Sequence, residues 1–131
     1  IVVNVKFEDG DLPLELIVNG DEVLIFSMLS NLIINAIEAS PINRTVSIDI
    51  VYGKEMIVSI TNDGAVPVEI RDTIFAKYHT YGKKKGTGLG TYSSKIMATA
   101  MGFKVEFDVS DEEDTTTFII AMPNISKEGS A

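Results

Sequence analysis

The stretch Asn31–Leu32–Ile33–Ile34–Asn35–Ala36–Ile37–Glu38–Ala39 combines two asparagines with an apolar helical pattern. The pattern starts at Asp21, because apolar residues recur from there at spacings of three and four. Asp21 is suited to cap the first turn, and Pro41 cannot continue a helix. The sequence therefore predicts a largely buried helix from residue 21 to residue 39.

A polar stripe runs along this predicted helix. Ser27, Asn31, Asn35 and Glu38 are separated by four, four and three residues, which places them on one face. A solvent-facing edge would show the same spacing. However, an exposed face would be better served by Lys or Glu than by two asparagines, and amide oxygens can ligate a hard cation such as Mg²⁺. The stripe is thus either an exposed edge or a metal-binding face.

The rest of the chain predicts strands in pairs, with two further helices. The expected strand pairs are Ile1–Phe7 with Leu14–Val18 around the turn Asp9–Gly10–Asp11, Thr45–Tyr52 with Met56–Thr61 around Gly53–Lys54–Glu55, and Lys104–Val109 with Thr115–Met122 around the acidic turn Ser110–Asp114. A short helix follows Pro67, and a longer one covers Thr91–Met101 before Gly102. This order predicts an α/β two-layer sandwich, in which a mixed β-sheet carries three helices on one face.

Length and composition narrow the class of protein. A chain of 131 residues suits one domain, which we place at residues 1–124 with a flexible tail at 125–131. Cysteine is absent and His79 is the single histidine, which excludes disulfides and makes a zinc site improbable. The net charge of −8 argues against nucleic acid and membrane surfaces as partners. With no apolar run near the roughly 20 residues of a membrane span, we expect a soluble domain, and the absence of cysteine fits a reducing cytoplasm.

The start at Ile1, without methionine, and the small polar residues at the end suggest a piece of a longer protein. Any anionic ligand must be bound locally, because the overall charge is negative. Five of the 11 basic residues gather in one part of the chain, at Lys77, Lys83, Lys84, Lys85 and Lys95. We expect such a ligand to bind there.

Three glycines alternate in Gly86–Thr87–Gly88–Leu89–Gly90, directly before the helix predicted from Thr91. Glycine permits close backbone approach, and a helix start offers unpaired N–H groups to a phosphate. The spacing differs from a Walker motif, and no strand precedes it as in a Rossmann fingerprint. A flexible linker would also be rich in glycine, so the motif alone leaves both interpretations open.

The segment Thr61–Asn62–Asp63–Gly64 lies at the end of a predicted central strand. A side-chain oxygen at this position could accept a hydrogen bond from the exocyclic amine of adenine. An ordinary Asn-Asp-Gly turn would have the same sequence.

Together, these segments resemble the histidine-kinase branch of the superfamily that contains the DNA gyrase and MutL ATPases, built on the Bergerat fold. The segment 31–39 resembles the asparagine box, which implies that Asn35 binds Mg²⁺. Asn62–Asp63–Gly64 resembles the first glycine box, and Ile74–Phe75 with Tyr78 resembles the phenylalanine box. The resemblance extends to the second glycine box, whose backbone contacts the phosphates, at Gly86, Thr87, Gly88, Leu89 and Gly90. Thr117 resembles a strand threonine that assists adenine recognition.

The resemblance also implies a lid over the nucleotide from Tyr78 to Lys85, in which Lys83 and Lys85 offset phosphate charge and His79 is a lid residue. The first glycine box departs from the family pattern, because Asn62 stands at the usual aspartate position and Ala65–Val66 replaces the second glycine. Asn62 and Asp63 both remain candidates for the adenine contact, and the spacing to Gly64 favours Asn62. A second difference concerns Glu38, because some kinases of this type have a lysine or arginine at that position.

The function implied is the ATP-binding catalytic domain of a sensor histidine kinase with ATP and Mg²⁺. It would phosphorylate a histidine on a separate dimerisation domain of the same protein and act upstream of a response regulator. The alternatives are an ATPase or serine kinase of the same fold, or a silent nucleotide-binding module. Those ATPase relatives carry a glutamate general base where Asn31 stands, and an amide cannot remove a proton from water.

We therefore expect the isolated chain to bind Mg·ATP yet hydrolyse it very slowly. General-base catalysis is worth about a hundred- to ten-thousand-fold, so Asn31→Glu should raise hydrolysis measurably even with imperfect geometry. Phosphate release at saturating nucleotide measures both rates. Brisk hydrolysis by the unmodified chain would favour an ATPase instead.

Overall fold

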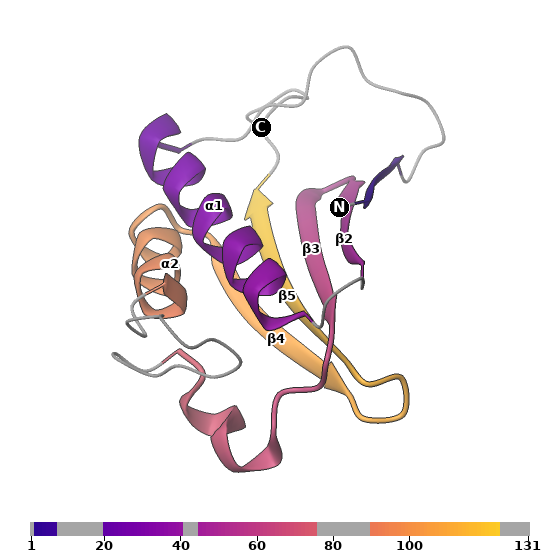
Figure 1. Ribbon diagram of the computed structural model, residues 1–131. Helices are drawn as coiled ribbons and strands as arrows, with labels where there is room; N and C mark the ends of the chain where they lie inside the picture. The colour runs from indigo at the N-terminus through magenta and orange to yellow at the C-terminus, as the bar shows by residue number, and fades with distance from the viewer. Residues whose placement is uncertain (1, 8–19, 41–44, 76–89, 124–131) are drawn as a thin grey trace.

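The computed structural model describes residues 2–7, 20–40, 45–75 and 90–123. In this part of the chain, five strands form one sheet in the order β1-β2-β3-β5-β4. β1 runs parallel to β2, and every other neighbouring pair is antiparallel. Two α-helices pack against each other over one face of the sheet (Figure 1). The predicted α/β class with a mixed sheet is confirmed.

The described elements lie close to their predicted positions. They are β1 (Val2–Phe7), α1 (Glu22–Ala39), β2 (Val46–Tyr52), β3 (Glu55–Asp63), the 3₁₀-helix η1 (Val68–Thr73), α2 (Gly90–Ala100), β4 (Lys104–Ser110) and β5 (Thr115–Pro123). β3 starts earlier than predicted, because Glu55 already pairs with Pro123, and it ends later, at Asp63. Asn62 and Asp63 are therefore strand residues paired with β5, not residues of a free turn. The predicted turn Asp9–Gly10–Asp11, strand Leu14–Val18 and tail 125–131 lie outside the described residues.

The third predicted helix differs from expectation. η1 is a single 3₁₀ segment of six residues that begins after Pro67, and it lies past the end of β3 (Figure 1). So short a segment cannot offset the cost of starting an α-helix. Two α-helices, rather than three, thus cover the described sheet.

The core lies between α1, α2 and the inner face of the sheet. Along β5, buried and partly buried residues alternate, as expected of a strand with one covered face. The buried apolar residues include Met28, Leu32, Ala36, Val58, Ile60, Ala98, Val105, Phe118, Ile120 and Met122. The helices are also joined by a hydrogen bond from the Ser94 hydroxyl to the Met28 carbonyl oxygen, 3.3 Å long.

By length and hydropathy, α1 would be long enough to cross a membrane, a property shared by many core helices. Met28, Leu32, Asn35 and Ala36 on this helix are buried within the domain. The opposite side exposes further apolar residues, including Val23, Phe26 and Ile34, which raises the hydropathy of the whole helix. Its packing on the sheet identifies α1 as a core helix.

The N-terminus of α1 is capped as the sequence predicts. The Asp21 carboxylate accepts hydrogen bonds from the Val23 and Leu24 N–H groups, at 2.9 and 3.0 Å. We expect Asp21→Ala to lower the free energy of unfolding by about 1 kcal/mol, because both donors lose their partner. Chemical denaturation would measure the change. Asp21→Ser should retain most of the stability, and equal stability of the alanine variant would contradict the capping role.

Candidate functional site

Two asparagines are buried where α1 and β3 face the core. Asn35 on α1 is 4% exposed and Asn62 on β3 is 1% exposed. The Asn35 Nδ2 donor and the Asn62 Oδ1 acceptor have no hydrogen-bond partner among the described residues. An unsatisfied buried polar group costs about 1–3 kcal/mol. Such groups call for an explanation, and a ligand that completes the hydrogen bonds is one.

The orientation of the Asn62 amide is determined by its neighbour. Asn62 Nδ2 donates to the Asp63 carbonyl oxygen at 2.9 Å. Reversing the amide would bring two oxygens together, so the nitrogen must face this carbonyl. The oxygen is left as an unpaired acceptor. Asn62 thereby offers the chemistry of a carboxylate oxygen without its charge.

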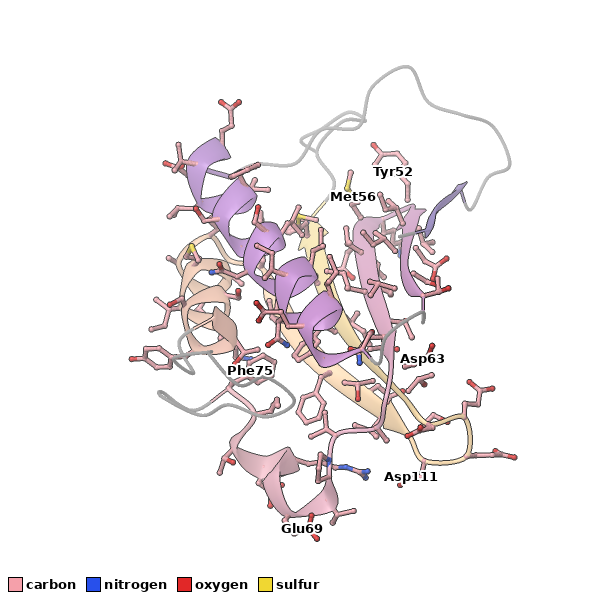
Figure 2. The ribbon with its side chains drawn as sticks, viewed as in Figure 1. Tyr52, Met56, Asp63, Glu69, Phe75 and Asp111 are labelled. Carbon is pink, nitrogen blue, oxygen red and sulfur yellow. The ribbon has the colours of Figure 1, made fainter. Side chains whose placement is uncertain are left out.

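Strand geometry separates Asn62 from Asp63. Successive side chains of a strand point to opposite faces, and Asn62 shares the buried face with Val58 and Ile60. Asp63 belongs to the other face, and Figure 2 shows it at the end of β3, directed away from α1. Of the two candidates left open by the sequence, Asn62 is the one on the helix-covered side.

The same alternation determines which threonine of β5 lies beside Asn62. Thr117 lies opposite Thr61 across the strands, and their hydroxyl oxygens are 2.9 Å apart on the face away from Asn62. Thr116 is fully buried and lies directly opposite Asn62. The structure therefore does not bring Thr117 to Asn62, but it does bring Thr116. Thr116 is separated by two and four residues from the apolar Phe118 and Ile120, so alternation along the strand could have placed it on the buried face from the sequence.

The chain turns at Gly64, immediately after these strand residues. Its φ is +107°, a conformation that L side chains rarely adopt. A side chain here would stand 3.9 Å from the Ala39 carbonyl oxygen at the end of α1. Gly64 thus lies where the end of α1 meets the end of β3. Asn35 lies one turn earlier on α1, and Asn31, half-buried, one turn before that.

The start of α2 is held to the end of η1. The buried Thr91 hydroxyl donates to the Ile74 carbonyl oxygen at 2.8 Å. Phe75, in the predicted phenylalanine box, packs edge-on against Phe107 and Phe118, with ring centroids 5.8 and 5.9 Å apart. Gly90 is the first residue of α2. The predicted site residues Lys83, Lys85, Gly86, Thr87, Gly88 and Leu89, together with Tyr78 and His79, lie outside the described residues.

Lys95 contacts the backbone of the sheet and an aromatic ring. Its Nζ donates to the Val105 carbonyl oxygen at 2.9 Å and lies 5.2 Å from the centroid of the Phe75 ring. These contacts direct its charge toward the sheet and an aromatic face. Sequence clustering had grouped Lys95 with the lysines that could bind an anion.

Asn35 is compatible with Mg²⁺ bound together with a phosphate ligand. Among the described residues, no group of three or more His, Cys, Asp or Glu side chains could hold a metal ion. A cation at α1 would therefore depend on an amide oxygen, water and ligand oxygens. Mg²⁺ commonly binds in this way, with one or two protein ligands and the phosphates of its substrate.

The fold and the two buried amides define a two-layer α/β domain with an incomplete polar site between α1 and β3. Residues 20–125 match the family described as Histidine kinase-, DNA gyrase B-, and HSP90-like ATPase, and the chain belongs to this family.

The chain is 29% identical over 110 residues to the heme sensor protein HssS of Staphylococcus aureus, covering 82% of this chain and 24% of that protein. The chain therefore spans about a quarter of the length of the curated relatives that it matches. A nucleotide-free catalytic domain of the histidine kinase ThkA is 30% identical, with a TM-score of 0.71 over 93% of this chain and 79% of that one. The mycobacterial sensor histidine kinase MprB shares the fold, with a TM-score of 0.76 and 22% identity over 94% of this chain and 81% of that one.

Proposed function

We propose that this chain is the ATP-binding catalytic domain of a sensor histidine kinase, with residues 1–124 as the domain and 125–131 as a tail. The observation that carries the proposal is a pair of buried amide atoms, one on Asn35 and one on Asn62, that have no hydrogen-bond partner among the described residues of a member of an ATPase family. ATP is a ligand able to contact both. The similarity to the catalytic domain of the histidine kinase ThkA supports kinase activity over hydrolysis.

Asn62 would recognise the base. Adenine carries an exocyclic amine that donates hydrogen bonds, whereas guanine has a carbonyl oxygen at the same ring position. The Asn62 Oδ1 acceptor matches the amine and opposes the carbonyl. Because the Asp63 carbonyl holds the amide in this orientation, Asn62 favours ATP over GTP.

The phosphates would extend from the base toward Asn35 and the start of α2. Asn35 would bind Mg²⁺ through its amide oxygen, and its Nδ2 would donate to a phosphate oxygen; the ion supplies charge neutralisation when bound. The N–H groups at the start of α2, from Gly90, suit phosphate oxygens. We assign the same task to Gly86, Thr87, Gly88 and Leu89, and charge compensation to Lys83 and Lys85.

Phosphoryl transfer depends on positioning and electrostatic stabilisation more than on protein side-chain chemistry. A histidine nitrogen of the separate dimerisation domain attacks the γ-phosphorus, the bond to the β–γ bridging oxygen breaks, and ADP leaves. An imidazole is already nucleophilic, so the absence of a glutamate at Asn31 does not impede transfer to histidine, whereas hydrolysis lacks its base. This distinction favours the kinase over an ATPase of the same fold.

The proposed partners are the histidine-bearing dimerisation domain and a response regulator. ThkA has been solved in complex with the response regulator protein TrrA, which supports a regulator as the downstream partner of the present kinase. Such a kinase domain would act in the cytoplasm.

Asn35→Ala tests the catalytic assignment. We expect it to abolish Mg-dependent phosphorylation of an added histidine domain while leaving the melting temperature unchanged or higher, because the unpaired Nδ2 is removed. Ser30→Ala on the opposite side of α1 serves as the control. Full phosphotransfer by the Asn35 variant would remove this residue from the mechanism.

Asn62→Leu tests the base contact, because we expect it to affect nucleotide affinity without lowering stability. Removing a buried acceptor without a partner should leave stability unchanged or raised, whereas Mg·ATP binding should weaken about tenfold or more. Calorimetry of unfolding and of binding would measure both. Asp63→Ala is the matched control, since the Asp63 carbonyl that orients Asn62 belongs to the backbone and is retained. A larger loss of ATP affinity in the Asp63 variant would reverse the assignment.

A further inference from the structure

The backbone that follows β3 is bound by two residues of the β4–β5 hairpin. The Asp114 carbonyl oxygen accepts the Gly64 N–H at 2.7 Å, and its carboxylate accepts the Ala65 N–H at 2.9 Å. The Thr116 hydroxyl donates to the Gly64 carbonyl oxygen at 2.8 Å and accepts the Val66 N–H at 3.0 Å. Four polar groups of the main chain between Gly64 and Val66 are thereby bonded to the hairpin.

Asp114 has the conformation that this double contact requires. Its φ is +57°, which makes it the only described non-glycine residue with positive φ. Aspartate tolerates the left-handed region better than most residues do, and β-branched residues tolerate it poorly. In this conformation, the carbonyl and the carboxylate of one residue reach adjacent N–H groups.

The same turn of the hairpin has a second attachment, through Asp111. Arg71 of η1 donates to both carboxylate oxygens of Asp111, at 2.7 and 3.3 Å, and its Nε donates to the Val66 carbonyl oxygen at 2.8 Å. Figure 2 shows Asp111 at the hairpin tip, near η1. The hydrogen bond from Arg71 holds the pKa of the Asp111 carboxyl below its usual value, so this carboxyl stays ionised at neutral pH.

One peptide group connects this arrangement to Asn62. The N–H bonded by Asp114 and the Asp63 carbonyl that orients the Asn62 amide belong to the same peptide unit, between Asp63 and Gly64. A peptide unit is planar, so holding its N–H also determines the direction of its carbonyl. The orientation of Asn62 therefore depends on Asp114, which lies 52 residues away in the sequence.

We propose that Asp114 is a positioning residue for base selection: through the Asp63–Gly64 peptide it keeps the Asn62 oxygen, rather than the nitrogen, available to the nucleotide base. The inference rests on the proposed function, since it assumes that Asn62 contacts the base. If the peptide turns, Asn62 loses its partner and its amide is free to reverse. The reversed amide presents a donor, which suits the carbonyl oxygen of guanine.

A series of substitutions at Asp114 separates its contacts. Asp114→Asn keeps the side-chain acceptor and tolerates positive φ. Asp114→Gly retains the backbone carbonyl but removes the side-chain bond to Ala65 and adds backbone freedom, so the carbonyl is held less firmly against the Gly64 N–H. Asp114→Val removes that bond and disfavours the conformation as well. Glu112→Val is the matched control on the same exposed turn.

Binding of Mg·ATP and Mg·GTP to each variant of the whole chain, with melting temperatures alongside, tests the proposal. We expect the preference for ATP over GTP to be retained in Asp114→Asn and Glu112→Val, to fall in Asp114→Gly, and to fall by about tenfold in Asp114→Val, roughly the effect of one hydrogen bond. If Asp114 has a purely structural role, its substitution would weaken the binding of both nucleotides in equal proportion.

An unchanged preference, or an equal loss for both nucleotides, would overturn the role of Asp114. If Asp114→Val does not fold, the comparison of the glycine and asparagine variants decides the question. A native chain that binds neither nucleotide would disprove the proposed function and this inference together. A native chain that prefers ATP, with variants that leave the preference intact, would disprove the inference alone.

Discussion

The structure depends on the alternation of side chains along β3. This strand pairs with β2 on one side and β5 on the other, so it cannot rotate without breaking two ladders. Because Val58 and Ile60 face the core, Asn62 must face it as well. A polar side chain is thereby buried at the end of an apolar row, against the helix that carries Asn35. The site follows from this placement.

Burying two amides without complete hydrogen bonding lowers stability, and the domain offsets that cost with its apolar core. The aromatic contacts of Phe75, the Thr91 bond to Ile74 and the Lys95 bond to Val105 attach the start of α2 and the end of η1 to the sheet. The polar site is thus surrounded by elements whose positions are determined by packing. Packed surroundings of this kind suit a ligand site, because they hold its side chains in place.

The altered first glycine box illustrates how a loop conformation can be specified from a distance. The family pattern places two glycines there, whereas this chain has Gly64 followed by Ala65 and Val66. The lost glycine is accompanied by hydrogen bonds between this backbone and the side chains of Asp114 and Thr116, which hold the segment from Gly64 to Val66. The β4–β5 hairpin thereby supports the backbone next to Asn62.

The sequence by itself determined the helix of residues 21–39, the β2–β3 and β4–β5 hairpins and the α/β class, because periodicity, capping and turn residues act over a few positions. It also predicted a metal-binding role for Asn35 and left Asn62 and Asp63 as candidates for the base contact. Only the tertiary structure placed Asn62 rather than Asp63 on the helix-covered face, placed Thr116 rather than Thr117 beside Asn62, bonded Lys95 to Val105 and connected Asp114 to the Asp63–Gly64 peptide. The physical reason is that strand register and contacts between distant segments are established by the pairing of whole strands, which local sequence patterns do not specify.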